Sequence, residues 1–387
     1  MKRFFLIAVA VLCIIVAQSI SAQAADGNKA PLAKAKLFAK LPTEMSGPDG
    51  LTVSPKTGTI FLTVPNFNSG GRKSGDSKPP KKYPGILAKV SLDGKVEKLL
   101  EFPPLESTGQ TGCMGLVFGT DGNLYVCDNQ YFFDTDHKSR VLRVLMDGDK
   151  PTGKVEVAVE GLNLANAAAW HEGKLYVSDT FLDVPGKVGA GGIWAFPAKD
   201  ILKAGSGDNP PIKVKPVKSL NSRQYPKYLL IALEAKKSER GDNAGFDGIT
   251  FANGTLYTGN FGDGTLYAIR FSRTGRVVTA EVIHKGETTI KCCDGVYYDK
   301  NANKIYVNDS QRNAIWSFKP TRRGQAAKLE LVAENGDTDG ADGSLDQPCE
   351  CIVIDKKMII VNFDWPFPGL VNTKYDEPST LSVIELP

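Results

Sequence analysis

Histidine is scarce in this sequence. Among 387 residues there are three, His137, His171 and His284. A zinc or copper centre built mainly from imidazole ligands therefore has few residues to draw on. Charge of one sign is not in excess either, because 47 Lys and Arg residues oppose 43 Asp and Glu residues. A nucleic-acid-binding protein would present a strongly basic face, so we expect no nucleic-acid partner.

Several catalytic motifs are missing as well. The sequence has no Gly-Xaa-Ser-Xaa-Gly motif, no phosphate-binding glycine loop and no dinucleotide fingerprint. Serine hydrolases with that motif, P-loop kinases and Rossmann enzymes therefore have no support. The apolar run 4–17 is shorter than the about 20 residues that a membrane-spanning helix requires, and no later run reaches that length.

Residues 1–24 have the order of a secretory signal peptide. Lys2 and Arg3 precede the apolar run, and Ala22-Gln23-Ala24 supplies a cleavage site of small residues. We therefore expect a mature chain with one domain, residues 25–387, that is secreted or periplasmic and has no membrane association after cleavage. Its six cysteines would lie in a compartment where disulfides form, and the sequence alone does not choose their pairing.

One pattern returns six times along the chain. Its first part is a tight turn that leads into a short strand, and its second part is a β-branched and aromatic run a few residues later. The first parts are 48–53, 113–118, 165–170, 246–251, 293–298 and 349–354, and the second parts are 59–62, 123–126, 174–177, 255–258, 304–307 and 357–360. Further strands follow in most copies. Units of four strands, repeated six times, predict an all-β six-bladed β-propeller.

The last unit shows only three strands. We expect the missing fourth strand to be 36–41, from the mature N-terminus, which would close the ring and leave no open sheet edge. Between the units, residues 228–238 are expected to form a short helix, and the lysine-rich stretch 72–82 a solvated flap.

One position in the first part carries a side-chain oxygen in five of the six units. Its residues are Asp49, Met114, Asn166, Asp247, Asp294 and Glu350. We interpret the glycines that follow several of them, such as Gly50 and Gly248, as turn residues with a positive φ. The first strand of a propeller blade lines the central channel, so these six side chains, called here the ring residues, would surround one axis.

Carboxylates that converge in a channel of low dielectric repel each other unless a cation neutralises them. Ca²⁺ takes carboxylate and amide oxygens in flexible numbers, so the pattern predicts calcium or another divalent cation. The predicted ligands are Asp49, Asn166, Asp247, Asp294 and Glu350. Two alternatives stay open: Asp and Asn also favour tight turns for local reasons, and the nearby cysteines with Met114 could bind a softer metal such as copper or zinc.

This repeat, with Asn/Asp-Gly-hydrophobic followed by Leu-Tyr-Val, resembles the gluconolactonase and senescence-marker-protein (regucalcin) family, with paraoxonases and diisopropyl fluorophosphatase as more distant relatives. The resemblance implies a divalent metal, usually calcium, held by residues at the positions of Asp49, Asn166 and Asp247. The family has Glu where this chain has Asp49. The acid that serves as general base in the sugar lactonases falls on Met114, which takes no proton, so a base must come from elsewhere.

The candidate catalytic residues are therefore Asp294, then Glu350, with His137 as a proton shuttle from the loop 130–139. Long loops on the metal face carry Tyr131, Phe132, Phe133, Trp365 and Phe367, which would form an apolar wall. The leading hypothesis is a calcium-dependent hydrolase of lactones or other esters. The alternative is a non-catalytic propeller with structural calcium that binds a sugar, peptide or protein on its loop face.

Blades five and six are neighbours in such a ring. We therefore hypothesise a disulfide between Cys292 or Cys293 and Cys349 or Cys351.

Overall fold

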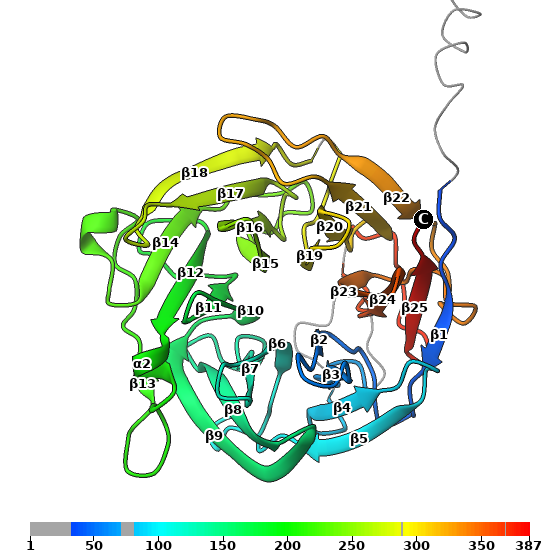
Figure 1. Ribbon diagram of the computed structural model, residues 1–387, viewed down its shortest axis with the longest axis horizontal. Coiled ribbons are helices and arrows are strands. Elements are labelled where there is room, and N and C mark those ends of the chain that lie inside the picture. The colour runs from blue at the N-terminus through cyan, green and yellow to red at the C-terminus, as the bar shows by residue number, and fades with distance from the viewer. Residues whose placement is uncertain (1–31, 71–80, 288, 368) are drawn as a thin grey trace, which may run out of the picture. The chain divides into compact units, whose positions relative to one another are not determined.

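Six sheets are arranged around one central axis in the computed structural model, which describes residues 32–70, 81–287, 289–367 and 369–387 (Figure 1). The six-bladed β-propeller predicted from the repeat is confirmed. Residues 33–387 form one compact unit. The predicted signal peptide, 1–24, and residues 72–80 of the lysine-rich stretch lie outside the described residues.

The blades are numbered along the chain, and each is given from its innermost strand outward. Blade one contains β2 (Leu51–Val53), β3 (Ile60–Val64), β4 (Ile86–Val90) and β5 (Val96–Glu101), and blade two contains β6 (Cys113–Phe118), β7 (Leu124–Asp128), β8 (Ser139–Asp147), β9 (Lys150–Leu162) and β13 (Ile212–Lys213). Blade three contains β10 (Ala165–His171), β11 (Lys174–Asp179), β12 (Ala190–Pro197) and β14 (Leu229–Glu234), and blade four contains β15 (Phe246–Ala252), β16 (Thr255–Asn260), β17 (Leu266–Phe271) and β18 (Val277–His284). Blade five contains β19 (Val296–Asp299), β20 (Lys304–Asp309), β21 (Ala314–Phe318) and β22 (Glu330–Glu334), and blade six contains β23 (Pro348–Ile354), β24 (Lys357–Asn362), β25 (Thr380–Glu385) and β1 (Lys36–Lys40).

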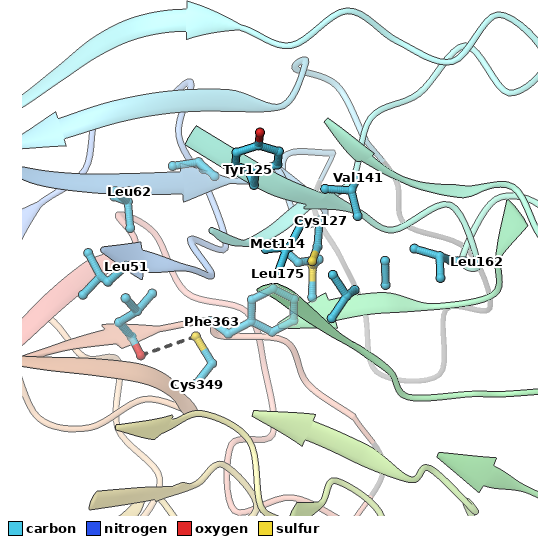
Figure 2. Packing of buried hydrophobic residues seen from close by; sticks show 14 of the residues in the cluster. Leu51, Leu62, Met114, Tyr125, Cys127, Val141, Leu162, Leu175, Cys349 and Phe363 are labelled. Atoms are coloured by element: carbon cyan, nitrogen blue, oxygen red, sulfur yellow. Dashed lines mark hydrogen bonds between the residues drawn. The ribbon is translucent and has the colours of Figure 1, made fainter. Parts of the chain in front are cut away.

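Burial along the strands follows their place in the blade. The second strands β3, β7 and β16 are buried at every position, because neighbouring blades cover both of their faces. The outermost strands β5 and β18 consist mostly of half-buried and exposed residues. The largest apolar cluster runs between blades and includes Leu51, Leu62, Met114 and Phe363 (Figure 2).

The N-terminal strand closes the ring as predicted. β1 pairs antiparallel with β25, with Lys36 opposite Val383 and Lys40 opposite Thr380. The backbone N–H of Leu41 continues the pairing by donating to the carbonyl of Ser379. Blade six therefore consists of three strands from the C-terminus and one from the N-terminal region.

The predicted helix at 228–238 is wrong. Residues Leu229–Glu234 form β14, which pairs with β12 from Ala190↔Glu234 to Trp194↔Leu229 and completes blade three. Helix within the described residues is confined to α2 (Ala198–Ile201) and the 3₁₀ turn η1 (Ser222–Gln224). Neither is long or apolar enough to cross a membrane.

Candidate functional site

A cavity of about 210 Å³ lies at one end of the central channel. Five of the six ring residues line this central cavity, and they are Asp49, Met114, Asn166, Asp247 and Asp294. The prediction that blade-start side chains from different repeats meet in one cavity therefore holds for five positions. The other lining residues are Asn129, Tyr131, Phe132, Leu164, Thr180, Phe181, Asp242, Phe261, Phe363 and Phe367.

In five of the six blades, a polar residue near the end of the second strand holds the start of the first strand. In blade three, Asp179 accepts hydrogen bonds from the backbone N–H groups of Asn163 (3.2 Å) and Leu164 (2.7 Å). Asp309 does the same in blade five for Lys291 (3.0 Å) and Cys292 (3.1 Å). The equivalent acceptors are Asn66 for Ser46, Asp128 for Gly112 and Asn362 for Asp346. These bonds fix the backbone two to four residues before a ring residue.

The blade-start glycines serve close packing between blades. Gly50, Gly115, Gly248 and Gly295 are absent from the residues with positive φ, so the interpretation as left-handed turn residues is wrong. A Cβ at Gly248 would lie 2.4 Å from the carbonyl oxygen of Asp294, and one at Gly295 would lie 2.4 Å from that of Cys349. The backbone N–H of Gly248 donates to the carbonyl of Asp294 (3.1 Å), so successive first strands touch through their backbones.

The carboxylates of the central cavity raise each other's pKa. Burial, then the charges of Asp247 and Glu350, raise the pKa of Asp49 well above its usual range. Burial, then Asp247 and Asp49, do the same for Asp294. Burial, then the charge of Glu350, which lies outside the cavity lining, raise the pKa of Asp247 to about 8, although hydrogen bonds from Asn166 and Thr180 oppose the rise. The lining contains no Lys, Arg or His, so no cationic side chain of the cavity wall compensates these groups.

Asn166 and Asp247 already form a contact across two blades. The Asn166 Nδ2 donates to Asp247 Oδ2 at 2.6 Å and lies 3.4 Å from Thr180 Oγ1. This arrangement fixes the amide so that its nitrogen faces Asp247 rather than the cavity. Asp247 is 3% exposed and Asp49 8% exposed, so both carboxylates sit almost out of water.

The chemistry of this donor set fits a hard divalent cation, because four carboxylates (Asp49, Asp242, Asp247 and Asp294) and two amides (Asn129 and Asn166) line a single cavity without a cationic side chain. Across the described residues, no three His, Cys, Asp or Glu side chains lie close enough together to hold one ion. Calcium at this site would therefore draw on Asn166 and on backbone or water oxygens in addition to carboxylates.

Two predicted site residues do not line the central cavity. Glu350 lines a separate cavity of about 410 Å³, together with Leu51, Trp170, Phe251 and Tyr297. Its Oε1 accepts from the backbone N–H of Cys351 (2.9 Å), and burial raises its pKa to about 7. His137 has a positive φ of 51°, and its Nδ1 lies 3.9 Å from Asp136 Oδ1.

Aromatic side chains form a wall over the ring residues. Tyr131, Phe132 and Phe367 line the central cavity as predicted, whereas Phe133 and Trp365 do not. Trp365 stacks on Phe367 with ring centroids 4.7 Å apart and lies 4.9 Å from the Phe132 centroid, so it supports the wall from behind. Tyr131 stacks on Phe181 at 4.9 Å.

Sequence reasoning missed several lining residues. Asn129 and Thr180 directly follow the Asp that ends a second strand, in Cys-Asp-Asn and Ser-Asp-Thr. This repeated pair could have predicted both lining residues. The Asp at the end of the second strand holds the start of the first strand, and the residue directly after that Asp lines the cavity. Phe181 and Phe261 come from loops with no repeated pattern.

All six cysteines after the N-terminal region are buried free thiols, so the hypothesised bridge between blades five and six is not formed. Cys349 Sγ donates to the carbonyl of Asp49 at 3.4 Å, and Cys292 Sγ lies 3.2 Å from Ser310 Oγ. Burial raises the pKa of Cys113 to about 12 and that of Cys293 well above its usual range. These thiols act as small apolar residues between blades.

The architecture is that of a six-bladed β-propeller. No family model matches the sequence, and no curated protein matches it. Among solved structures, the chain is similar to a PQQ-bound aldose sugar dehydrogenase from Streptomyces coelicolor, with 15% identity, coverage of 92% of this chain and 99% of that one, and a TM-score of 0.55. It is also similar to a calcium-binding regucalcin from Agrobacterium tumefaciens, with 13% identity, 92% and 96% coverage, and a TM-score of 0.51.

A structure described as a putative gluconolactonase is similar at 13% identity, with 91% and 92% coverage and a TM-score of 0.50. The structural neighbours thus include the gluconolactonase and regucalcin propellers that the repeat resembles. At these identities the similarity establishes a propeller fold like theirs.

Proposed function

We propose that this protein is an exported hydrolase of lactones or other esters that uses a divalent cation, calcium, in the central cavity. The observation that carries the proposal is the convergence of Asp49, Asp247 and Asp294 with Asn166 in one cavity that no cationic side chain lines. The lactonase-like propeller fold supports it, and the signal-like residues 1–24 support export to the periplasm or the exterior.

Asp49, Asn166 and Asp247 would hold the ion. When bound, calcium supplies a Lewis acid for the carbonyl or phosphoryl oxygen of the substrate. Asp294 would accept the proton of the attacking water, because it lies in the same cavity on a different blade and is hydrogen-bonded by Ser310. The aromatic wall of Tyr131, Phe132 and Phe367 would bind the apolar part of an ester and exclude water.

Neither Glu350 nor His137 lines the central cavity, so this mechanism gives neither a step, although the charge of Glu350 raises the pKa of Asp49, Asp247 and Asp294. Met114 favours the alternative function, a non-catalytic propeller that uses calcium as a structural ion and binds a sugar, peptide or protein on its loop face. Its thioether is 6% exposed and packs in the apolar cluster that joins the blades (Figure 2). Met114 therefore packs as an apolar core residue and supplies no acid or base at this ring position.

The test measures turnover of γ- and δ-lactones and aryl esters with and without a chelator. We expect chelator-sensitive turnover, and Asp294→Asn should lower kcat about 10²- to 10⁴-fold while calcium binding persists. Asp247→Ala should abolish calcium binding and lower Tm. Asp208→Asn, which changes an exposed carboxylate, is the matched control. Bound calcium without turnover on any substrate would establish the non-catalytic alternative.

A further inference from the structure

Blade six carries a second group of carboxylates, none of which lines the central cavity. The connection from β22 to β23 contains Asp337-Thr338-Asp339-Gly340-Ala341-Asp342-Gly343-Ser344-Leu345-Asp346. The connection from β24 to β25 adds Asp364 and Asp376. We call Asp337, Asp339, Asp346, Asp364 and Asp376 the outer acidic group.

Hydrogen bonds tie these two connections together. Thr373 Oγ1 donates to Asp337 Oδ2 at 2.6 Å. Asp364 uses both carboxylate oxygens within its own loop, accepting from Asn372 Nδ2 (3.0 Å) and from the backbone N–H of Asp376 (2.8 Å). Asp364 therefore orders the loop that presents Asp376, and its own carboxylate is already satisfied.

Two carboxylate oxygens in this group are buried without a partner. Asp346 is 3% exposed, and its Oδ1 has no hydrogen-bond partner among the described residues. Asp376 Oδ1 pairs with Lys374 Nζ at 2.8 Å, but its Oδ2 is buried and likewise unpaired. A buried carboxylate oxygen without a donor or cation is costly to fold, so each points to a missing partner.

The local charge is strongly negative. Burial, then Asp376, Asp337 and Asp339, raise the pKa of Asp346 to about 8, and Lys374 opposes the rise. Lys374 itself is largely exposed and is occupied by Asp376 Oδ1. It therefore leaves the unpaired oxygens of Asp346 and Asp376 without a cation.

The backbone at Gly340 packs closely against Asp346. Gly340 has a φ of +59°, and a Cβ there would lie 3.1 Å from Asp346 Oδ2 and 3.2 Å from Thr380 Oγ1. The absence of a side chain at Gly340 lets its backbone approach the Asp346 carboxylate and the Thr380 hydroxyl oxygen, which therefore lie close to the same glycine. Thr380 Oγ1 is held in place by a hydrogen bond from Asn362 Nδ2 at 3.1 Å.

We propose that the outer acidic group binds a divalent cation of the calcium type, with Asp346 Oδ1 and Asp376 Oδ2 as its carboxylate ligands. Calcium accepts six to eight oxygens, among them hydroxyls, backbone carbonyls and waters, so two carboxylates suffice as the charged part of the set. Asp337 and Asp339 at the surface raise the local attraction for a cation. The bound ion would clamp the two long connections of blade six onto each other, independently of the central cavity.

The experiment measures bound calcium per chain and Tm for the full chain, with Ca²⁺ alone as the probe. Asp346→Asn/Asp376→Asn should lose one equivalent of bound calcium, and calcium should raise its Tm by several degrees less than that of the unchanged protein. The control is Asp342→Asn, which removes one carboxylate charge from the same loop as Asp346; the Asp342 carboxylate instead accepts from the backbone N–H of Ser344 (2.8 Å). Asp247→Ala, in the central cavity, should keep the outer equivalent.

Unchanged calcium stoichiometry in Asp346→Asn/Asp376→Asn would overturn the proposal. A higher Tm for that variant without calcium, together with unchanged stoichiometry, would show that the pair instead shares a proton. If this variant loses one calcium ion and Asp247→Ala retains it, the outer site is supported whether or not the protein hydrolyses esters. The two proposals can therefore fail independently of each other.

Discussion

At the scale of single residues, the close contact between successive first strands depends on glycines, which have no side chain. Gly248→Ala would place a Cβ 2.4 Å from the carbonyl oxygen of Asp294 and 2.6 Å from the backbone nitrogen of Val296. Backbone atoms of a neighbouring blade cannot move aside cheaply, so we expect a loss of about 1–3 kcal/mol in unfolding free energy. Urea denaturation measures it. Gly336→Ala, with nothing within 4 Å of its Cβ, should be neutral; equal stabilities would contradict the packing role.

Lys81 shows how one residue of a charged stretch can leave the solvent. The predicted flap 72–82 is wrong at this residue, because Lys81 lies against Phe67 and Phe133, with Nζ 6.0 and 5.9 Å from their ring centroids, and donates to the carbonyl of Thr111. Burial lowers its pKa to about 8. Composition predicts a solvated stretch but does not show which lysine a neighbouring aromatic cluster covers.

This lowered pKa predicts a pH effect. The unfolded chain keeps the proton on Lys81 up to its usual pKa, while the folded chain releases it near pH 8, so this residue makes the protein more stable as pH rises from about 8 to 10. The contribution is the difference between the pH profiles of unfolding free energy for the unchanged protein and Lys81→Met. The exposed neighbour Lys82→Met is the control. A flat difference across that range would rule out the effect.

At the scale of elements, the long hairpin β8–β9 is fastened to blade three by one buried arginine. Arg143, 2% exposed, pairs with Glu156 (Nε to Oε2, 3.1 Å), and its Nη1 donates to the carbonyl of Leu202 (2.8 Å), directly after α2. Nothing in the repeat predicted this contact, because it joins an outer hairpin to a segment of another blade. For the same reason the parallel pairing of β13 with β9 was not foreseen.

Removing one partner of the Arg143–Glu156 pair should lower the unfolding free energy more than removing both partners. We expect Arg143→Met to lower the unfolding free energy by roughly 3 kcal/mol, since it strands a buried carboxylate that keeps only Lys154 (2.8 Å). The double change Arg143→Met/Glu156→Leu should recover part of that loss. Lys98→Met, which breaks the exposed pair with Glu101, should cost under about 1 kcal/mol. A double variant as unstable as the single one would contradict this reading.

The element predictions succeeded where the repeat was regular. The turn and strand motif located the first two strands of every blade, because the same turn and the same buried second strand recur in each repeat. It failed at β14, because Leu229–Leu233 is a short continuous apolar run that fits a helix or a buried strand equally well. The pairing with β12 makes this segment a strand, and such pairing cannot be predicted from the residues of the segment alone.

At the scale of the whole molecule, stability depends on the closure of blade six. A chain that starts at Ala33 keeps β1, whereas one that starts at Thr43 exposes the edge of β25 along its whole length. We expect the shorter chain to unfold at a lower temperature and to self-associate through the open edge. Calorimetry and size-exclusion chromatography compare the two. Identical Tm and monomeric behaviour would show that closure adds nothing.

The candidate site was predictable to the extent that it follows the symmetry of the ring. Five ring residues meet because each occupies the same position in its blade. Glu350 does not line the central cavity, because its side chain accepts from the backbone N–H of its neighbour Cys351 and lies beside Gly295. An alignment of the repeats does not show these local contacts. The aromatic lining and the outer acidic group come from connections that differ in every blade.

The pairing of β1 with β25 also sets the order of assembly during translation. Among the described strands β1 is synthesised first and its partner β25 last, so blade six cannot form until β25 has left the ribosome. During that time β1 is a strand without a partner, and the five finished blades form an arc with two open ends. The ring therefore closes only after all of its other strands have been synthesised.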